Sequence, residues 1–97
     1  MAAHNPPHPG EFLTAVYLGP NGLSARELAV TLDASASTLH RILKGQSGIS
    51  PDMALRLSKA LGRSPESWLA LQSRYDLWQA KQRVQLSRVG RVRLTAV

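Results

Sequence analysis

The chain has 97 residues, of which 43% are hydrophobic and 19% charged, a composition typical of one globular domain. It contains no cysteine, which excludes disulfides, thiol catalysis and cysteine-based zinc sites. Twelve bases against six acids give a net charge of +6, which favours a polyanionic partner. Five of the bases and none of the acids fall within residues 79–97, so the excess lies at the C-terminal end.

The first ten residues lack the features of a targeting segment. They have neither a basic region nor an apolar core, so they do not resemble a signal peptide. No apolar run approaches the ~20 residues that a membrane-spanning helix requires. We therefore expect a soluble, cytoplasmic protein.

Residues 1–8 are rich in proline, which predicts an extended N-terminal arm. His4 and His8 are spaced like a helical metal pair, but two prolines separate them and further ligands are lacking, so we expect no metal and no cofactor. Pro9 suits the first position of a helix. A cluster of breaker residues at 18–22 is expected to end that helix. Its buried face is assigned to Phe12, Leu13 and Val16.

The stretch 23–45 predicts two short helices joined by a tight turn. Ser24 and Glu27 form an S-x-x-E capping box at the start of the first helix. Ser35 is an N-cap candidate for the second helix, and Gly45 supplies a left-handed end. The residues that the second helix leaves outside its apolar face are small or polar: Ala36, Ser37, Thr38, His40, Arg41 and Lys44.

This outward face is typical of a helix that reads a DNA groove. Small residues near its start let the backbone approach the DNA, and longer polar side chains further along reach the base edges. The alternative is an ordinary helical hairpin whose polar face is only solvated. The pattern is a poor enzyme site, because the six acids fall at helix starts or turns, where capping explains most of them. We expect no catalytic residue.

Two further helices are predicted from Ser-Pro-acid starts at residues 50–52 and 64–66. In the second of them, aromatic and leucine side chains recur at helical spacing. Trp68 and Leu71 are assigned to the core. Tyr75 and Trp78 lie late in the helix, after most of the core is accounted for, and we assign them to a dimer interface.

The chain is thus predicted to be all-α, a compact bundle of five helices. Residues 9–82 form the helical domain, and residues 83–97 form a basic C-terminal tail. Within the tail, Arg91-Val92-Arg93-Leu94 alternates polar and apolar side chains, a weak strand signal. A lone strand is unstable, so the tail either adds to a partner as a short strand or is a mobile end.

The stretch LSARELA…DASASTLHRILKG resembles the Cro/Xre-type helix-turn-helix, which has a Cro/lambda-repressor-like fold. Over about residues 8–80 the chain looks like the HigA-type antitoxins of bacterial toxin–antitoxin pairs. The segments that carry this resemblance are HPGEFL, GISPDMALRLSKALG and SPESWLALQ. The last residues, after about residue 82, match no motif of that family.

The resemblance implies a homodimer that neutralises a small toxin, usually an mRNA endonuclease, and that represses its own operon by binding double-stranded operator DNA. It implies that Ser35, Ala36, Ser37 and Arg41 lie nearest the bases. It also implies phosphate contacts, which we assign to Ser24, Arg26, Thr38, His40, Lys44 and Gln46. Because Ala36 and Ser37 are small where related repressors often carry longer amides, Arg41 is expected to supply much of the direct readout. Such a protein would be cytoplasmic, and nucleoid-associated when bound to its operator.

Two other functions are consistent with the sequence. A stand-alone Xre-type transcriptional repressor without a toxin partner would have the same helices. A protein-interaction module that has lost DNA binding would show no salt-dependent affinity for duplex DNA. An enzyme is the least consistent with the residues, because no acid partners His40 in sequence.

Overall fold

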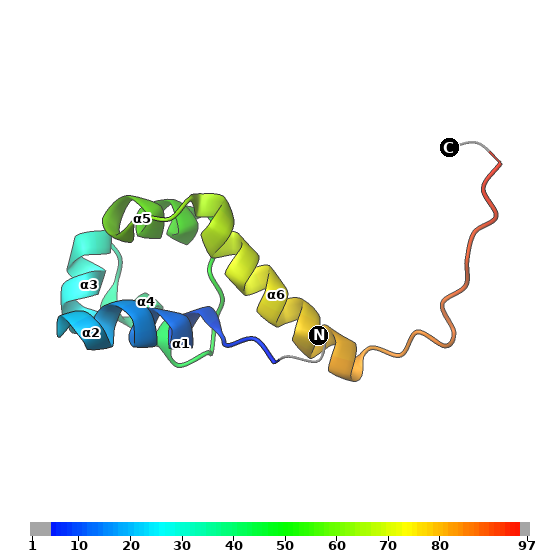
Figure 1. Ribbon diagram of the computed structural model, residues 1–97, viewed down its shortest axis with the longest axis horizontal. Helices are drawn as coiled ribbons and strands as arrows, with labels where there is room; N and C mark the ends of the chain where they lie inside the picture. The colour runs from blue at the N-terminus through cyan, green and yellow to red at the C-terminus, as the bar shows by residue number, and fades with distance from the viewer. Residues whose placement is uncertain (1–4, 96–97) are drawn as a thin grey trace.

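The computed structural model describes residues 5–95, and α-helices make up its folded body (Figure 1). The chain begins with one continuous helical run, made of α1 (Pro9–Leu13), the π-helical segment η1 (Thr14–Leu18) and α2 (Gly19–Asn21). Four α-helices follow: α3 (Ala25–Leu32), α4 (Ala36–Leu43), α5 (Pro51–Leu61) and α6 (Pro65–Arg83). With the first run taken as one unit, the all-α, five-helix prediction is confirmed.

Serine side chains start the four later helices, as the sequence predicts. The Ser24 hydroxyl accepts a hydrogen bond from the Glu27 backbone N–H, and Ser35 does the same for Thr38. Ser50 and Ser64 cap α5 and α6 in the same way, each followed by proline at the first helical position. These bonds satisfy donors that a helix start would otherwise leave unpaired.

The first helix ends within the predicted breaker cluster, at Gly22, whose φ is 60°, after continuing through Pro20. The π-helical segment makes this possible: the Gly19 N–H bonds to Thr14 five residues back, and the wider turn accommodates the proline. The same segment shifts the helix face, so that Val16, predicted to be buried, is 45% exposed while Leu18 is buried.

Trp68 is fully buried at the start of α6 and joins the first helical run to the rest of the core. Its indole N–H donates to the Gly62 carbonyl at 3.0 Å. The rings of Phe12 and Tyr17 pack against it at centroid distances of 6.0 and 5.7 Å. The Arg63 guanidinium lies 5.4 Å from its ring centroid, within cation–π range. The prediction that Trp68 belongs to the core is confirmed.

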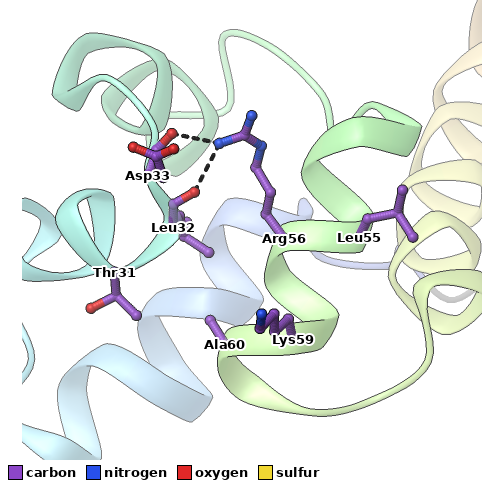
Figure 2. A pocket seen from close by; sticks show the side chains of 7 residues that line it. All are labelled: Thr31, Leu32, Asp33, Leu55, Arg56, Lys59 and Ala60. Carbon is purple, nitrogen blue, oxygen red and sulfur yellow. Dashed lines mark hydrogen bonds between the residues drawn. The ribbon is translucent and has the colours of Figure 1, made fainter.

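Arg56 of α5 closes the C-terminal end of α3. Figure 2 shows its guanidinium reaching the carbonyl oxygens of Leu32 and Asp33, to which it donates hydrogen bonds. Its Nε lies 2.6 Å from the Asp52 carboxylate, one turn earlier on α5. Helix ends leave carbonyls without partners, so this side chain satisfies groups that the tight turn exposes.

The C-terminal tail runs away from the end of α6 (Figure 1). Its described part, residues 84–95, is exposed and contains no strand within the single chain. No other described strand lies beside it to pair with. Across residues 5–95, none of the helices has both the length and the apolar character needed to cross a membrane.

Gly10 brings α1 into direct contact with the end of α4. A Cβ atom at this position would lie 2.0 Å from the Ile42 carbonyl oxygen and 2.8 Å from the Leu43 Cα, both backbone atoms. Neither atom can move without displacing the α4 backbone. Only glycine allows the two helices to approach this closely.

We therefore expect Gly10→Ala to lower the free energy of unfolding by about 1–3 kcal/mol, the usual cost of overpacking a filled interior. Urea unfolding followed by circular dichroism measures the change. Gly90→Ala is the matched control, because a Cβ at Gly90 meets nothing within 4 Å. Equal unfolding midpoints for the two variants would contradict the contact.

Candidate nucleic-acid interface

The outward face of α4 forms an open hollow together with the loop that follows it. Leu39 and Ile42, 0% and 2% exposed, face the core and thereby turn the opposite side of the helix to solvent. Six residues that the sequence assigned to DNA contacts line this hollow together: Ala36, Ser37, His40, Arg41, Lys44 and Gln46. These predicted base-proximal and phosphate-proximal side chains therefore lie on one surface.

Ser35 and Thr38, two other predicted contacts, do not line this hollow. The Ser35 hydroxyl accepts from the Thr38 N–H at 3.1 Å and donates to the Thr38 hydroxyl oxygen at 2.7 Å. Because a serine hydroxyl has a single proton, Ser35 has no donor left for a base. The Thr38 hydroxyl proton stays available, although the side chain is half-buried.

Ser24 and Arg26 are exposed at the start of α3 and do not line the hollow either. The Ser24 hydroxyl accepts from the Glu27 backbone N–H and also hydrogen-bonds to the Glu27 carboxyl. Ser24 is therefore engaged in the cap of α3, as Ser35 is in the cap of α4.

The loop after α4 is held by its own backbone and by α6. The Gly45 N–H bonds to Ile42 and the Gln46 N–H to Arg41, which satisfies carbonyls at the end of α4. On the far side of the loop, the Gln72 side chain accepts from the Ile49 N–H at 2.8 Å and donates to Asp76 at 3.0 Å. This positioning role was missed, and its one signal is a polar residue one turn after Trp68.

The two predicted dimer residues lie in the C-terminal half of α6, and both are half-buried within the single chain. Tyr75 packs edge-on against the His8 ring, with centroids 4.8 Å apart and planes at 81°. Leu77, between the two, is 56% exposed. Leu77 lies on another side of the helix than Tyr75, because residues two apart do not face each other.

His8 was assigned to an extended N-terminal arm, but it is an integral part of the fold. Its backbone is extended, with φ −64° and ψ 144°, while its side chain is only 9% exposed. Its Nδ1 accepts from the Gly10 N–H at 2.9 Å and so caps α1. His4, the other histidine of the arm, lies outside the described residues.

The hollow on the outward face of α4, called the reading surface below, carries little net charge. Arg41 and Lys44 are its two permanent cations, and both are exposed. A larger group of basic side chains lies away from α4, at the end of α6 and in the tail: Lys81, Arg83, Arg88, Arg91 and Arg93. A sequence-independent attraction to DNA would therefore arise mostly outside α4.

Comparison with known proteins places this surface in context. A helix-turn-helix family model matches residues 17–68, which contain α3 and α4. Virulence-associated protein I of Dichelobacter nodosus is 48% identical over 75 residues, covering 77% of this chain and 69% of that protein.

Two solved structures share the fold and much of the sequence. The antitoxin GraA has a TM-score of 0.79 and 44% identity, over 81% of this chain and 85% of that one. The Pseudomonas aeruginosa antitoxin HigA, solved with the higBA promoter, has a TM-score of 0.77 and 42% identity, over 79% and 84% of the two chains.

The capping box of α3 makes a pH-dependent contribution to stability. The Ser24 backbone N–H, and then its hydroxyl, hydrogen-bond to Glu27 and hold the pKa of that carboxyl below its ordinary value of 4.5. A carboxyl with a depressed folded-state pKa stabilises the fold above its unfolded pKa, and this stabilisation is lost as the pH falls through the folded pKa.

We expect wild-type stability to fall more steeply than that of Glu27→Gln as the pH drops from about 6 to about 3, because glutamine keeps the reciprocal bond without titrating. Urea unfolding at each pH gives the two curves. Glu66→Gln, at the start of α6, controls for charge removal alone. Parallel curves for wild type and Glu27→Gln would contradict a titrating cap.

Proposed function

Because the chain belongs to the Cro/Xre-type helix-turn-helix family, within the group of the HigA antitoxins, we propose that it is an antitoxin and an autorepressor. As a repressor it binds operator DNA of its own operon through α4. As an antitoxin it neutralises a cognate small toxin, an mRNA endonuclease. The proposal places the protein in the bacterial cytoplasm, on the nucleoid when it is bound to its operator.

The observation that carries the DNA-binding proposal is the shared hollow on the outward face of α4. It combines small side chains at the start of the helix with the long side chains of Arg41, Lys44 and Gln46 further along. This order lets the helix backbone enter a major groove while the longer side chains reach the bases and the phosphates.

Within this interface we assign base contacts to Ser37 and Arg41, next to the small Ala36. Arg41 has a guanidinium suited to bidentate contact with guanine. Ser35 acts there by capping α4. Phosphate contacts are assigned to Ser24, Arg26, Thr38, His40, Lys44 and Gln46.

The protein acts as a homodimer in this proposal. Tyr75 and Trp78 lie about one turn apart on α6, and a second copy would cover the accessible parts of their rings. A two-fold axis would set two copies of α4 about 34 Å apart, one turn of DNA, on a palindromic operator. Sedimentation that returns only the monomer mass at micromolar concentration would contradict this assembly.

Arg41→Ala is expected to weaken operator binding by about 1–3 kcal/mol, the value of one good base contact, and to leave scrambled DNA almost unaffected. Lys44→Ala should weaken both duplexes alike and reduce the slope of log affinity against log salt by about 0.9 per protomer. Gel-shift titrations at several salt concentrations measure both effects.

Arg74→Ala serves as the control, because it removes an exposed arginine from α6 outside the hollow. If Arg41→Ala lowered operator and scrambled affinities equally, direct readout by this residue would be wrong. Equal wild-type affinity for both duplexes would remove the basis for operator binding altogether.

The toxin-neutralising activity is expected to survive the loss of DNA readout. Arg41 is exposed on α4, so Arg41→Ala should still fold and bind the toxin. Co-expression with the neighbouring small reading frame tests this, with growth as the readout. If no adjacent gene is toxic when expressed alone, the stand-alone repressor is favoured instead.

A further inference from the structure

A second hollow adjoins the reading surface, where the start of α1 meets the end of α4 and the C-terminal half of α6. His8, Lys44, Gly45, Tyr75 and Gln79 line it. Lys44 also lines the hollow on the outward face of α4, so the two surfaces are continuous at this residue. The second hollow contains polar groups that the helix-turn-helix itself does not supply.

The His8 ring is held in a fixed orientation at this site. Nδ1 accepts the Gly10 N–H, and the ring packs edge-on against Tyr75. Gly45 faces the other side, since a Cβ there would lie 3.8 Å from Cγ of His8 and 3.9 Å from Cδ2. Contacts with Gly10, Gly45 and Tyr75, from three segments of the chain, therefore determine where Nε2 of His8 lies.

The hydrogen bond to Nδ1 also determines the tautomer. A neutral imidazole has one N–H donor and one acceptor, and the acceptor is Nδ1 because Gly10 donates to it. The ring proton of neutral His8 is consequently on Nε2. Within residues 5–95 no group hydrogen-bonds to Nε2, and the ring lines the hollow.

We propose that this hollow binds a phosphate of the DNA backbone, which accepts a hydrogen bond from Nε2 of His8 and is neutralised by the Lys44 ammonium. The proposal rests on the proposed operator binding and extends it to the N-terminal segment and α6. The end of α4 does not oppose the anion strongly, because the Arg41 and Ile42 carbonyls already accept N–H groups of the following loop. A preoriented donor beside a lysine is a suitable phosphate contact.

One acidic group faces the same hollow. Glu11, in the first turn of α1, lines it and makes no ion pair with Lys44. Its carboxylate repels an incoming phosphate and so weakens the contact. Glu11→Gln should therefore bind the operator more tightly than wild type does, by about threefold, because a like charge at the site is removed.

Two substitutions at His8 separate its two nitrogens. His8→Asn keeps an acceptor where Nδ1 lies, and so keeps the cap, but lacks a donor that reaches the Nε2 position. His8→Gln has an amide that reaches the Nε2 position but cannot cap α1 in the same way. We expect His8→Asn to weaken operator binding about tenfold, the value of one hydrogen bond to a charged group, whereas His8→Gln loses more stability than affinity.

The contacted phosphate is located with operators that carry one neutral methylphosphonate at a time. At a single position in each half-site, wild-type affinity should fall, and His8→Asn should cause no further loss. Urea unfolding and sedimentation of each variant exclude loss of folding or of dimer as the cause. If His8→Asn lowered operator affinity by the same factor at every methylphosphonate position, the proposal would be overturned. Unchanged operator affinity of Glu11→Gln would overturn it as well.

Different experimental results would contradict the proposed function and the proposed phosphate contact. If wild type does not distinguish operator from scrambled DNA, operator binding itself is wrong. If Arg41-dependent operator binding persists while wild type and His8→Asn share one methylphosphonate profile, only the phosphate contact is wrong. Loss of dimer rather than of DNA affinity in His8→Asn would assign the hollow to the subunit interface and overturn the contact as well.

Discussion

The position of α4, the helix proposed to read the DNA, depends on the contact between Gly10 and the Ile42 carbonyl. A side chain at position 10 would occupy the space of the α4 backbone, so α1 lies directly against the end of that helix. His8, two residues earlier, then packs on Tyr75 of α6. One close approach of two backbones thus joins three elements, and the outward face of α4 is oriented relative to all of them.

The aromatic cluster around Trp68 acts at the other end of the same framework. Trp68 holds the first turn of α6 against the first helical run and, through its N–H, against the Gly62 carbonyl. The Gln72 side chain accepts a hydrogen bond from the Ile49 N–H and so connects the next turn of α6 to the loop after α4. Since the C-terminal half of α6 makes few such contacts, it can offer its apolar side to a second copy while its first half supports the reading helix.

The features that could be predicted from the sequence are those decided by neighbouring residues. Serine caps, Ser-Pro starts and the capping box of α3 need only side chains three residues apart, and all are present. The features that could not be predicted depend on partners more than twenty residues away, as for Arg56 with Leu32 and Gln72 with Ile49. The π-helical segment belongs to this group, because the register that exposes Val16 places Leu18 and Tyr17 against a distant core. Likewise, the outward face of α4 could be predicted from local periodicity. The burial of His8 could not, because it depends on packing against Tyr75 of the distant helix α6.

The low charge of the reading surface has a consequence for specificity in the proposed function. Contacts to phosphates add affinity for every sequence, whichever basic groups make them. Here five of the twelve bases lie in the tail and at the end of α6, while α4 and its C-cap contribute only Arg41 and Lys44. Removing a base contact from such a helix costs a large share of its discrimination, because few other groups on it distinguish one base pair from another. Discrimination then depends on how accurately α4 is held in the groove. Contacts that hold it, such as Gly10 on Ile42 and Gln72 on the following loop, therefore affect specificity although none of these residues needs to touch a base.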